Sequence, residues 1–90
     1  MTQASGYEWD EAKRRSNLEK HRVDFRAIYN FEWDTATYED DDRHDEPRTK
    51  ATDFIGVVLY TVIYTERGPN THIISIRKAS LTEIMQYAQT

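Results

Sequence analysis

The sequence predicts one α+β domain over residues 1–90, in which helices pack on a small antiparallel sheet. Two observations predict this class. The first half carries helix-capping residues and apolar side chains at helical spacing, whereas the second half carries runs of β-branched and aromatic residues between turn formers. With 90 residues, of which 38% are hydrophobic, the chain can bury one modest core.

The N-terminal part is expected to form a short strand and two helices. The strand covers Tyr7–Trp9. Asp10 is a suitable N-cap for a helix from Glu11 to about His21, because its carboxylate can accept free N–H groups of the first turn. A second helix is expected over Asp24–Phe31, where apolar residues recur at helical spacing.

Charge is distributed unevenly along the chain. The formal net charge is −4, yet residues 46–90 hold five basic and four acidic side chains. Six of the eight residues in 39–46 are acidic, and like charges at this density predict an exposed loop. The acidity argues against a protein that binds nucleic acid through general positive charge, and leaves a local basic cluster in the second half as the alternative.

Three strands and a final helix are expected after the acidic run. The strands cover Arg48–Ile55, 57–65 and Thr71–Arg77, and the middle one is apolar enough to be central in the sheet. Simple alternation places His72, Ile74 and Ile76 on one face of the last strand. A capping box at Ser80 and Glu83 predicts a helix over Ser80–Gln89, with an apolar stripe directed at the sheet.

Several functional classes are disfavoured by what the sequence lacks. There is no cysteine, no Gly-x-Ser-x-Gly elbow and no phosphate-binding glycine loop. The acidic run lacks the alternating ligand spacing of a calcium loop, so we expect no metal and no cofactor. The longest apolar run, Phe54–Tyr64, is too short to cross a membrane and no secretory signal is evident, which predicts a cytoplasmic protein.

Basic strand ends and histidines are the candidate functional residues. Arg77 and Lys78 follow the last strand and could form an anion site, which Arg48 and Arg67 would join if the strand ends converge. The possible proton carriers at neutral pH are His21, His44 and His72. His21 could instead interact with a helix C-terminus, and His72 is more readily a sheet-face residue than a catalytic one.

The order of several short motifs resembles the BrnT toxin family over about residues 7–87. These motifs are Tyr7-Glu8-Trp9-Asp10-Glu11-x-Lys13, Asn17-Leu18-x-Lys20-His21-x-Val23-x-Phe25, Asp42-x-His44, Glu46-x-Arg48, Tyr64-Thr65-Glu66-Arg67-Gly68 and Ile73-Ile74-Ser75-x-Arg77-Lys78-Ala79, with Glu83 and Tyr87 in the last helix. Three positions depart from the family pattern: Arg22 and Asp53 replace common glycines, and Thr82 replaces a basic residue.

The resemblance implies a ribonuclease toxin of a type II toxin–antitoxin pair, with a RelE-like fold. It also implies a BrnA-like ribbon-helix-helix antitoxin, with which the toxin would form a hetero-oligomer, expected to be 2:2, that represses its own operon. The toxin would contact RNA, whereas operator DNA would be contacted only through the antitoxin, and no membrane partner is expected.

Metal-free RNA cleavage needs a base, an acid and cations that stabilise charge on the phosphate. The expected catalytic residues are Arg77, Arg48, His44, His21, Lys20 and Glu66, and the expected phosphate-binding residues are Arg67, Lys78, Arg48 and Arg77. The alternative is a catalytically degenerate module that binds the antitoxin and acts mainly as a co-repressor. A stand-alone RNA- or DNA-binding domain is less favoured, because the sequence shows no basic stripe with exposed aromatics.

Overall fold

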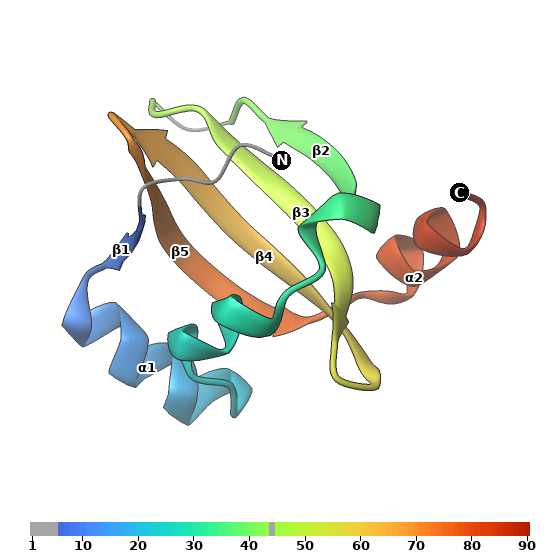
Figure 1. Cartoon of the computed structure of the whole chain (residues 1–90), viewed down its shortest axis with the longest axis horizontal. Helices are drawn as coiled ribbons and strands as arrows, with labels where there is room; N and C mark the ends of the chain where they lie inside the picture. Colours follow the sequence, from blue (N-terminus) through green and yellow to red (C-terminus); the bar gives the residue numbers. More distant parts are fainter. Residues whose placement is uncertain (1–5, 44) are drawn as a thin grey trace.

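The computed structural model contains a five-stranded sheet and one α-helix near each end of the chain (Figure 1). The structure describes residues 6–43 and 45–90. The elements are β1 (Gly6–Trp9), α1 (Glu11–His21), the 3₁₀ helices η1 (Phe25–Asn30) and η2 (Trp33–Thr35), β2 (Thr37–Asp41), β3 (Arg48–Ile55), β4 (Val58–Arg67), β5 (Asn70–Lys78) and α2 (Leu81–Ala88). No helix in the described part of the chain is long and apolar enough to cross a membrane.

The sheet has the strand order β1-β5-β4-β3-β2. The pairs β2–β3, β3–β4 and β4–β5 are antiparallel, as expected, and β4 lies at the centre. The edge strand β1, however, pairs with β5 in parallel, so the sheet is mixed rather than antiparallel. Since α1 and three further strands separate β1 from β5 along the chain, no local pattern in the sequence reports this pairing.

The second N-terminal helix predicted over Asp24–Phe31 is wrong as an α-helix. The segment forms the 3₁₀ helix η1, which Asp24 caps by accepting the backbone N–H of Arg26. Phe25 and Ile28 are both completely buried and lie three residues apart. That spacing matches the three-residue turn of a 3₁₀ helix, which places both side chains on one line toward the sheet.

The acidic run 39–46 is not entirely a loop, because Glu39–Asp41 belong to the edge strand β2. Basic residues on β3 explain why this segment can pair: Glu39 lies opposite Lys50 and Asp41 lies opposite Arg48. Opposite charges on facing strands reduce the repulsion within the run. Charge on an edge strand also protects the sheet from pairing with other chains.

The hydrophobic core lies on one face of the sheet, under η1 and η2. Its members are Val23, Phe25, Ile28, Phe31, Ala51, Val62, Tyr64, Ile73 and Ile76. Ile63 pairs with Ser75 and Tyr64 pairs with Ile73, so Ile74 is an extra residue in β5. This bulge puts Ile73 and Ile76 on the same buried face and makes the alternation predicted for His72, Ile74 and Ile76 wrong.

Helix α1 is attached to the sheet through the buried side chain of Asn17. Its Nδ2 donates to the carbonyl oxygens of Val23 (3.1 Å) and Ile76 (2.8 Å), and its Oδ1 accepts from the backbone N–H of Ile76 (3.3 Å). Asn17 therefore provides hydrogen-bond partners for the backbone of Ile76 at the edge of β5, beyond Ile73, the last residue that pairs with β1.

Arg22 ends α1 in the left-handed conformation, with φ of 62°. Its backbone N–H donates to the carbonyl oxygen of Leu18, and its side chain is exposed. A residue with a Cβ is strained here by about 1 kcal/mol, whereas glycine adopts the conformation freely.

We therefore expect Arg22→Gly to raise the free energy of unfolding by about 1 kcal/mol in urea denaturation. A matched control is Arg15→Gly at an exposed position inside α1, which should lower it by about the same amount because glycine disfavours the helix interior. If both substitutions destabilise the fold equally, the strain at Arg22 is not relieved by glycine and the explanation fails.

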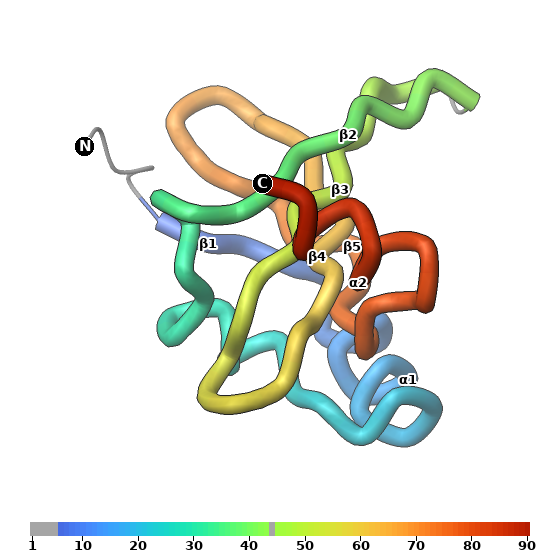
Figure 2. Tube along the Cα trace, turned by 90° about the vertical axis from the view of Figure 1, so that its right-hand side faces the viewer, coloured from blue at the N-terminus to red at the C-terminus, as the bar shows by residue number. Residues whose placement is uncertain are grey.

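The C-terminal helix α2 has the predicted capping box: Ser80 Oγ accepts the Glu83 N–H, and Glu83 Oε1 accepts the Ser80 N–H. Its apolar stripe, however, does not pack on the sheet, since Leu81 is 72% exposed and Met85 56% exposed. Figure 2 shows α2 on the opposite side of the sheet from η1 and η2. Glu83 and Tyr87 hold α2 instead. Glu83 makes polar contacts, and Tyr87 donates its hydroxyl to Asp53 (2.9 Å) and packs its ring edge-on against Phe54 (5.8 Å between ring centroids).

Candidate functional site

The face of the sheet opposite the core carries polar residues from three neighbouring strands. Register and alternation place Arg48, Lys50 and Thr52 of β3, Thr61, Ile63 and Thr65 of β4, and His72, Ser75 and Arg77 of β5 on this side, which we call the polar face. Thr52, Thr61 and Arg77 form one row across it, because Thr52 pairs with Thr61 and Thr61 pairs with Arg77.

Arg77 is fixed on the polar face by Glu83 of α2. Its two terminal nitrogens donate to the two carboxylate oxygens of Glu83, at 2.8 and 2.9 Å. Glu83 Oε1 also accepts from the hydroxyl of Thr61 at 2.8 Å, and that hydroxyl lies 2.8 Å from the hydroxyl of Thr52. The Arg77 side chain remains 26% exposed, so guanidinium N–H groups that are used neither by Glu83 nor by the carbonyl oxygen of Lys78 are available to an anion.

The same contacts control the ionisation of Glu83. Burial alone would favour the neutral carboxyl, but hydrogen bonds from Arg77, the Ser80 backbone and Thr61 lower the pKa of Glu83 to about 2. Glu83 is therefore a permanent anion near neutral pH. It positions Arg77 and does not exchange protons with a substrate.

This shift predicts a specific loss of stability in acid. Because the pKa of Glu83 is about 2 in the folded protein and 4.5 ordinarily, its ionisation stabilises the fold above pH 4.5, and this stability is lost as the pH falls toward 2. When the free energy of unfolding is measured in urea over this pH range, Glu83→Gln should show a smaller decrease toward low pH than the wild type. Glu19→Gln, at an exposed position of α1, should show the wild-type decrease. Identical curves for wild type and Glu83→Gln would contradict the assignment.

His21 and Lys20 end α1, and Asn17, one turn earlier in this helix, contacts Ile76, the neighbour of Arg77. Burial, followed by the positive charges of Lys20 and Arg77, lowers the pKa of His21 below its ordinary 6.5. The imidazole is therefore neutral at pH 7 and can accept a proton. A neutral base close to a fixed guanidinium is a suitable arrangement for activating a hydroxyl next to a phosphate.

The other predicted cations do not converge on this group. Arg48 lies near the opposite end of the polar face, because Thr49 pairs with Tyr64 whereas Arg77 pairs with Thr61. Arg48 and Arg77 are therefore separated by four residues in the strand direction, which corresponds to about 13 Å. Lys78 falls on the other face of β5 by alternation, so it does not join Arg77.

Arg67 and Glu66 are also separate from Arg77. Arg67 is paired with Glu46, with nitrogen–oxygen distances of 3.1 and 3.2 Å. Glu66 accepts from the Thr71 hydroxyl and lies on the core side of β4 by alternation. The strand ends therefore do not converge in the way that a single cluster of these four cations would require, since antiparallel pairing puts the start of β3 and the end of β5 at opposite ends of the sheet.

Near Arg67, the polar face carries a histidine–carboxylate pair. His72 Nδ1 lies 2.9 Å from Glu8 Oε2, and Asn70 donates to the other oxygen of Glu8. Hydrogen bonds from His72 and Asn70 lower the pKa of Glu8. Sequence reasoning could not find this pair, because it depends on the parallel contact between β1 and β5.

The remaining sequence predictions concern His44, a possible metal site and the departures from the family pattern at Asp53 and Thr82. His44 lies outside the described residues, and within those residues no group of three or more acidic or histidine side chains is placed to hold a metal ion. Asp53 is buried and accepts from the hydroxyls of Thr35 and Tyr87, and Thr82 is exposed. Neither Lys50, which shares the polar face with Arg48, nor Glu83, which holds Arg77, was among the predicted candidates, although the alternation from Arg48 to Lys50 could have indicated the former.

Residues 9–83 match a family model described as the ribonuclease toxin BrnT of a type II toxin–antitoxin system. The chain belongs to the BrnT family. It is also similar to the crystal structure of the Brucella abortus ribonuclease toxin BrnT, with 31% identity and a TM-score of 0.67. That match covers 83% of this chain and 96% of the other. A search of curated proteins found no match.

Membership of the BrnT family confirms the resemblance seen in the sequence and identifies a ribonuclease toxin of a toxin–antitoxin system. The similar structure also confirms the α+β class, with one N-terminal and one C-terminal α-helix on the sheet. The family implies an antitoxin partner for this BrnT chain.

Proposed function

We propose that this BrnT chain cleaves RNA without a metal ion, at the end of the polar face where Arg77, His21 and Lys20 lie. The supporting observation is a fixed, partly exposed guanidinium close to a histidine whose pKa is lowered. These groups supply two requirements of RNA cleavage, a base and a stabiliser of phosphate charge.

The reaction uses the ribose 2′-hydroxyl as its nucleophile. His21 takes the proton of the 2′-hydroxyl, and the 2′-oxygen forms a bond to the adjacent phosphorus while the bond to the 5′-oxygen breaks. Arg77 stabilises the negative charge on the phosphate oxygens. Lys20 donates a proton to the leaving 5′-oxygen, so that the products are a 2′,3′-cyclic phosphate and a 5′-hydroxyl.

The remaining predicted residues have other roles in this proposal. Arg48 contacts a phosphate further along the RNA, whereas Arg67 and Lys78 are left out, because Arg67 is paired with Glu46 and Lys78 falls on the other face of β5. Glu66 is left out because its carboxylate is on the core side of the sheet. His44 remains a predicted proton carrier.

We further propose a BrnA-like ribbon-helix-helix antitoxin in a 2:2 complex in the cytoplasm, which represses its own operon. Family membership supports a partner. The acidic β2 strand and its following loop offer a surface for a basic antitoxin segment. Assignment of the sheet to the RelE-like fold remains a prediction.

One observation favours the alternative of a catalytically degenerate co-repressor. Glu83 already occupies the two terminal nitrogens of Arg77, which an RNA phosphate would otherwise contact. The two functions differ in the free toxin: an active ribonuclease acts alone, whereas a degenerate module acts only in its complex.

Expression of the chain alone, and then with the neighbouring gene, tests this choice. The ribonuclease proposal expects growth arrest and RNA cleavage with the chain alone, and recovery when the antitoxin is present. Normal growth with intact RNA, combined with co-purification of the neighbouring gene's product, would support the co-repressor instead.

A further inference from the structure

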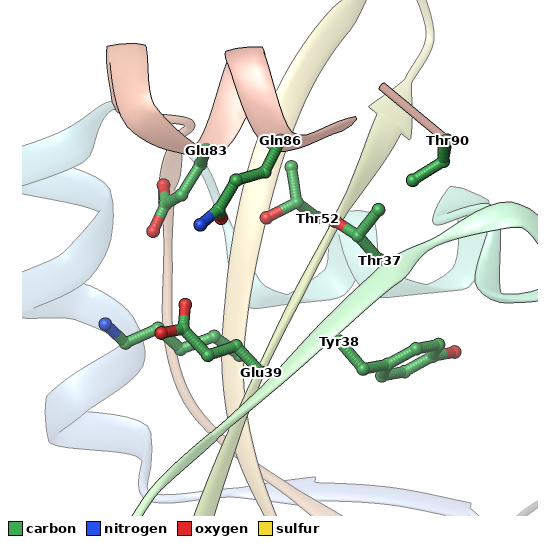
Figure 3. A pocket seen from close by; sticks show the side chains of 8 residues that line it. Thr37, Tyr38, Glu39, Thr52, Glu83, Gln86 and Thr90 are labelled. Carbon is green, nitrogen blue, oxygen red and sulfur yellow. The ribbon is translucent and has the colours of Figure 1, made fainter. Parts of the chain in front are cut away.

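A polar cleft lies between α2 and the strands β2 and β3, next to Arg77. It has a volume of about 350 Å³, which is sufficient for a small ligand. Its lining includes the side chains of Thr37, Glu39, Lys50, Thr52, Gln86 and Thr90. Figure 3 shows the side chains of Glu83 and Gln86 descending from α2 into the space above the Glu39 side chain, whereas the ring of Tyr38 points away.

Lys50 supplies positive charge to this cleft. It is half-buried on the polar face, two residues from Arg48 on the same side of β3. Glu39 lies opposite Lys50 in the strand register, yet the two side chains form no ion pair within the described residues. By contrast, Arg67 is occupied by Glu46, and Arg43 by Asp41. Lys50 is therefore a cation that a ligand in the cleft can use.

The cleft shares a wall with the proposed cleavage site. Glu83 lines the cleft and holds Arg77 through two hydrogen bonds. Thr52 also lines it and contacts Thr61, the residue opposite Arg77. A chain-like ligand with its phosphate at Arg77 can therefore place its next unit in the cleft.

The chemistry of the lining indicates what that unit is. Hydroxyl groups and a carboxamide offer donors and acceptors, Lys50 attracts an anion, and Glu39 accepts hydrogen bonds only. A nucleotide in single-stranded RNA matches this set, because it carries a phosphate, a 2′-hydroxyl and a base whose Watson–Crick edge is free.

We propose that this cleft binds the nucleotide next to the scissile phosphate of single-stranded RNA. Lys50 contacts the phosphate of that nucleotide, and Glu39 accepts a hydrogen bond from a base N–H. This inference rests on the ribonuclease function proposed above. It assigns Lys50 and Glu39 to substrate binding and to the choice of cleavage site.

Binding of a non-cleavable RNA, with a 2′-deoxy residue at the cleavage position, tests the role of Lys50. The oligonucleotide is titrated with wild type, Lys50→Ala, Lys50→Arg and Lys13→Ala at several salt concentrations, using fluorescence anisotropy. Lys13 is exposed on α1 and controls for the loss of one positive charge. Lys50→Ala should weaken binding and reduce the steepness of log K against log salt by about 0.7, the value for one phosphate contact on a single strand.

Lys50→Arg should restore the wild-type salt dependence, because it restores the charge. Equal binding by Lys50→Ala and Lys13→Ala would overturn the proposal. The wild type is assayed on cleavable RNA in parallel: absence of cleavage contradicts the ribonuclease function, whereas normal cleavage with unchanged binding by Lys50→Ala contradicts only the cleft.

Sequencing of the cleavage products tests Glu39. Glu39→Gln adds donors to a position that only accepts, so the preferred base beside the cut should change while Lys13→Ala keeps the wild-type preference. An unchanged preference with Glu39→Gln would contradict the proposed base contact.

Discussion

Replacing Arg77 with alanine is expected to lower the rate of RNA cleavage by about 10²–10³-fold, the usual effect of removing one donor that stabilises transition-state charge. The reason is the position of the guanidinium, which Glu83 fixes on the polar face while part of it stays exposed. The measurement is the single-turnover cleavage rate of a defined RNA by the purified protein.

Loss of Arg77 also leaves Glu83 as an unpaired, nearly buried anion, so the single substitution will reduce stability. The double variant Arg77→Ala/Glu83→Gln removes that charge and should recover stability without recovering cleavage. Arg15→Ala, at an exposed position of α1, is the control for net charge. Near-wild-type cleavage by the stable double variant would show that Arg77 has no role in the reaction.

Replacing Asn17 with alanine is expected to lower the free energy of unfolding by about 3 kcal/mol. The carboxamide makes hydrogen bonds to both backbone groups of Ile76 and to the carbonyl of Val23, and accepts from the Ser75 hydroxyl. Alanine would leave these buried groups without partners, which costs more than the net value of the bonds.

Urea denaturation of Asn17→Ala beside Ser16→Ala measures this effect. Ser16 is the exposed neighbour in the same helix, so its substitution should change stability by less than about 0.5 kcal/mol. Similar small changes for both variants would show that α1 is held to β5 by something other than Asn17.

Local signals in the sequence predicted the elements that local interactions determine. The Asp10 cap, the Ser80–Glu83 capping box and the apolar run of β4 each act within a few residues, and each formed as expected. Two of the corrections depend on distant partners. The β2 strand needs the basic residues of β3, and the parallel pairing of the predicted strand β1 needs β5, which follows it by about sixty residues of sequence.

The same distinction applies to the site. Arg77 and His21, on which the proposed cleavage site rests, could be named as candidates because each stands at the end of a predictable element. The contact between Glu83 and Arg77 could not be predicted, because the capping-box position of Glu83 does not indicate that its carboxylate also accepts hydrogen bonds from Arg77 and Thr61. Whether Arg48 and Arg67 would join Arg77 depended on which strand ends lie together, and the sequence does not determine this because the strand order involves distant residues.

Metal-independent cleavage by Arg77 and His21 is tested by incubating RNA with the purified chain in excess EDTA. The wild type should cleave and leave 2′,3′-cyclic phosphate and 5′-hydroxyl ends, and His21→Ala and the stable Arg77→Ala/Glu83→Gln variant should cleave far more slowly. Intact RNA with the wild type, or products with 5′-phosphate ends, would contradict it.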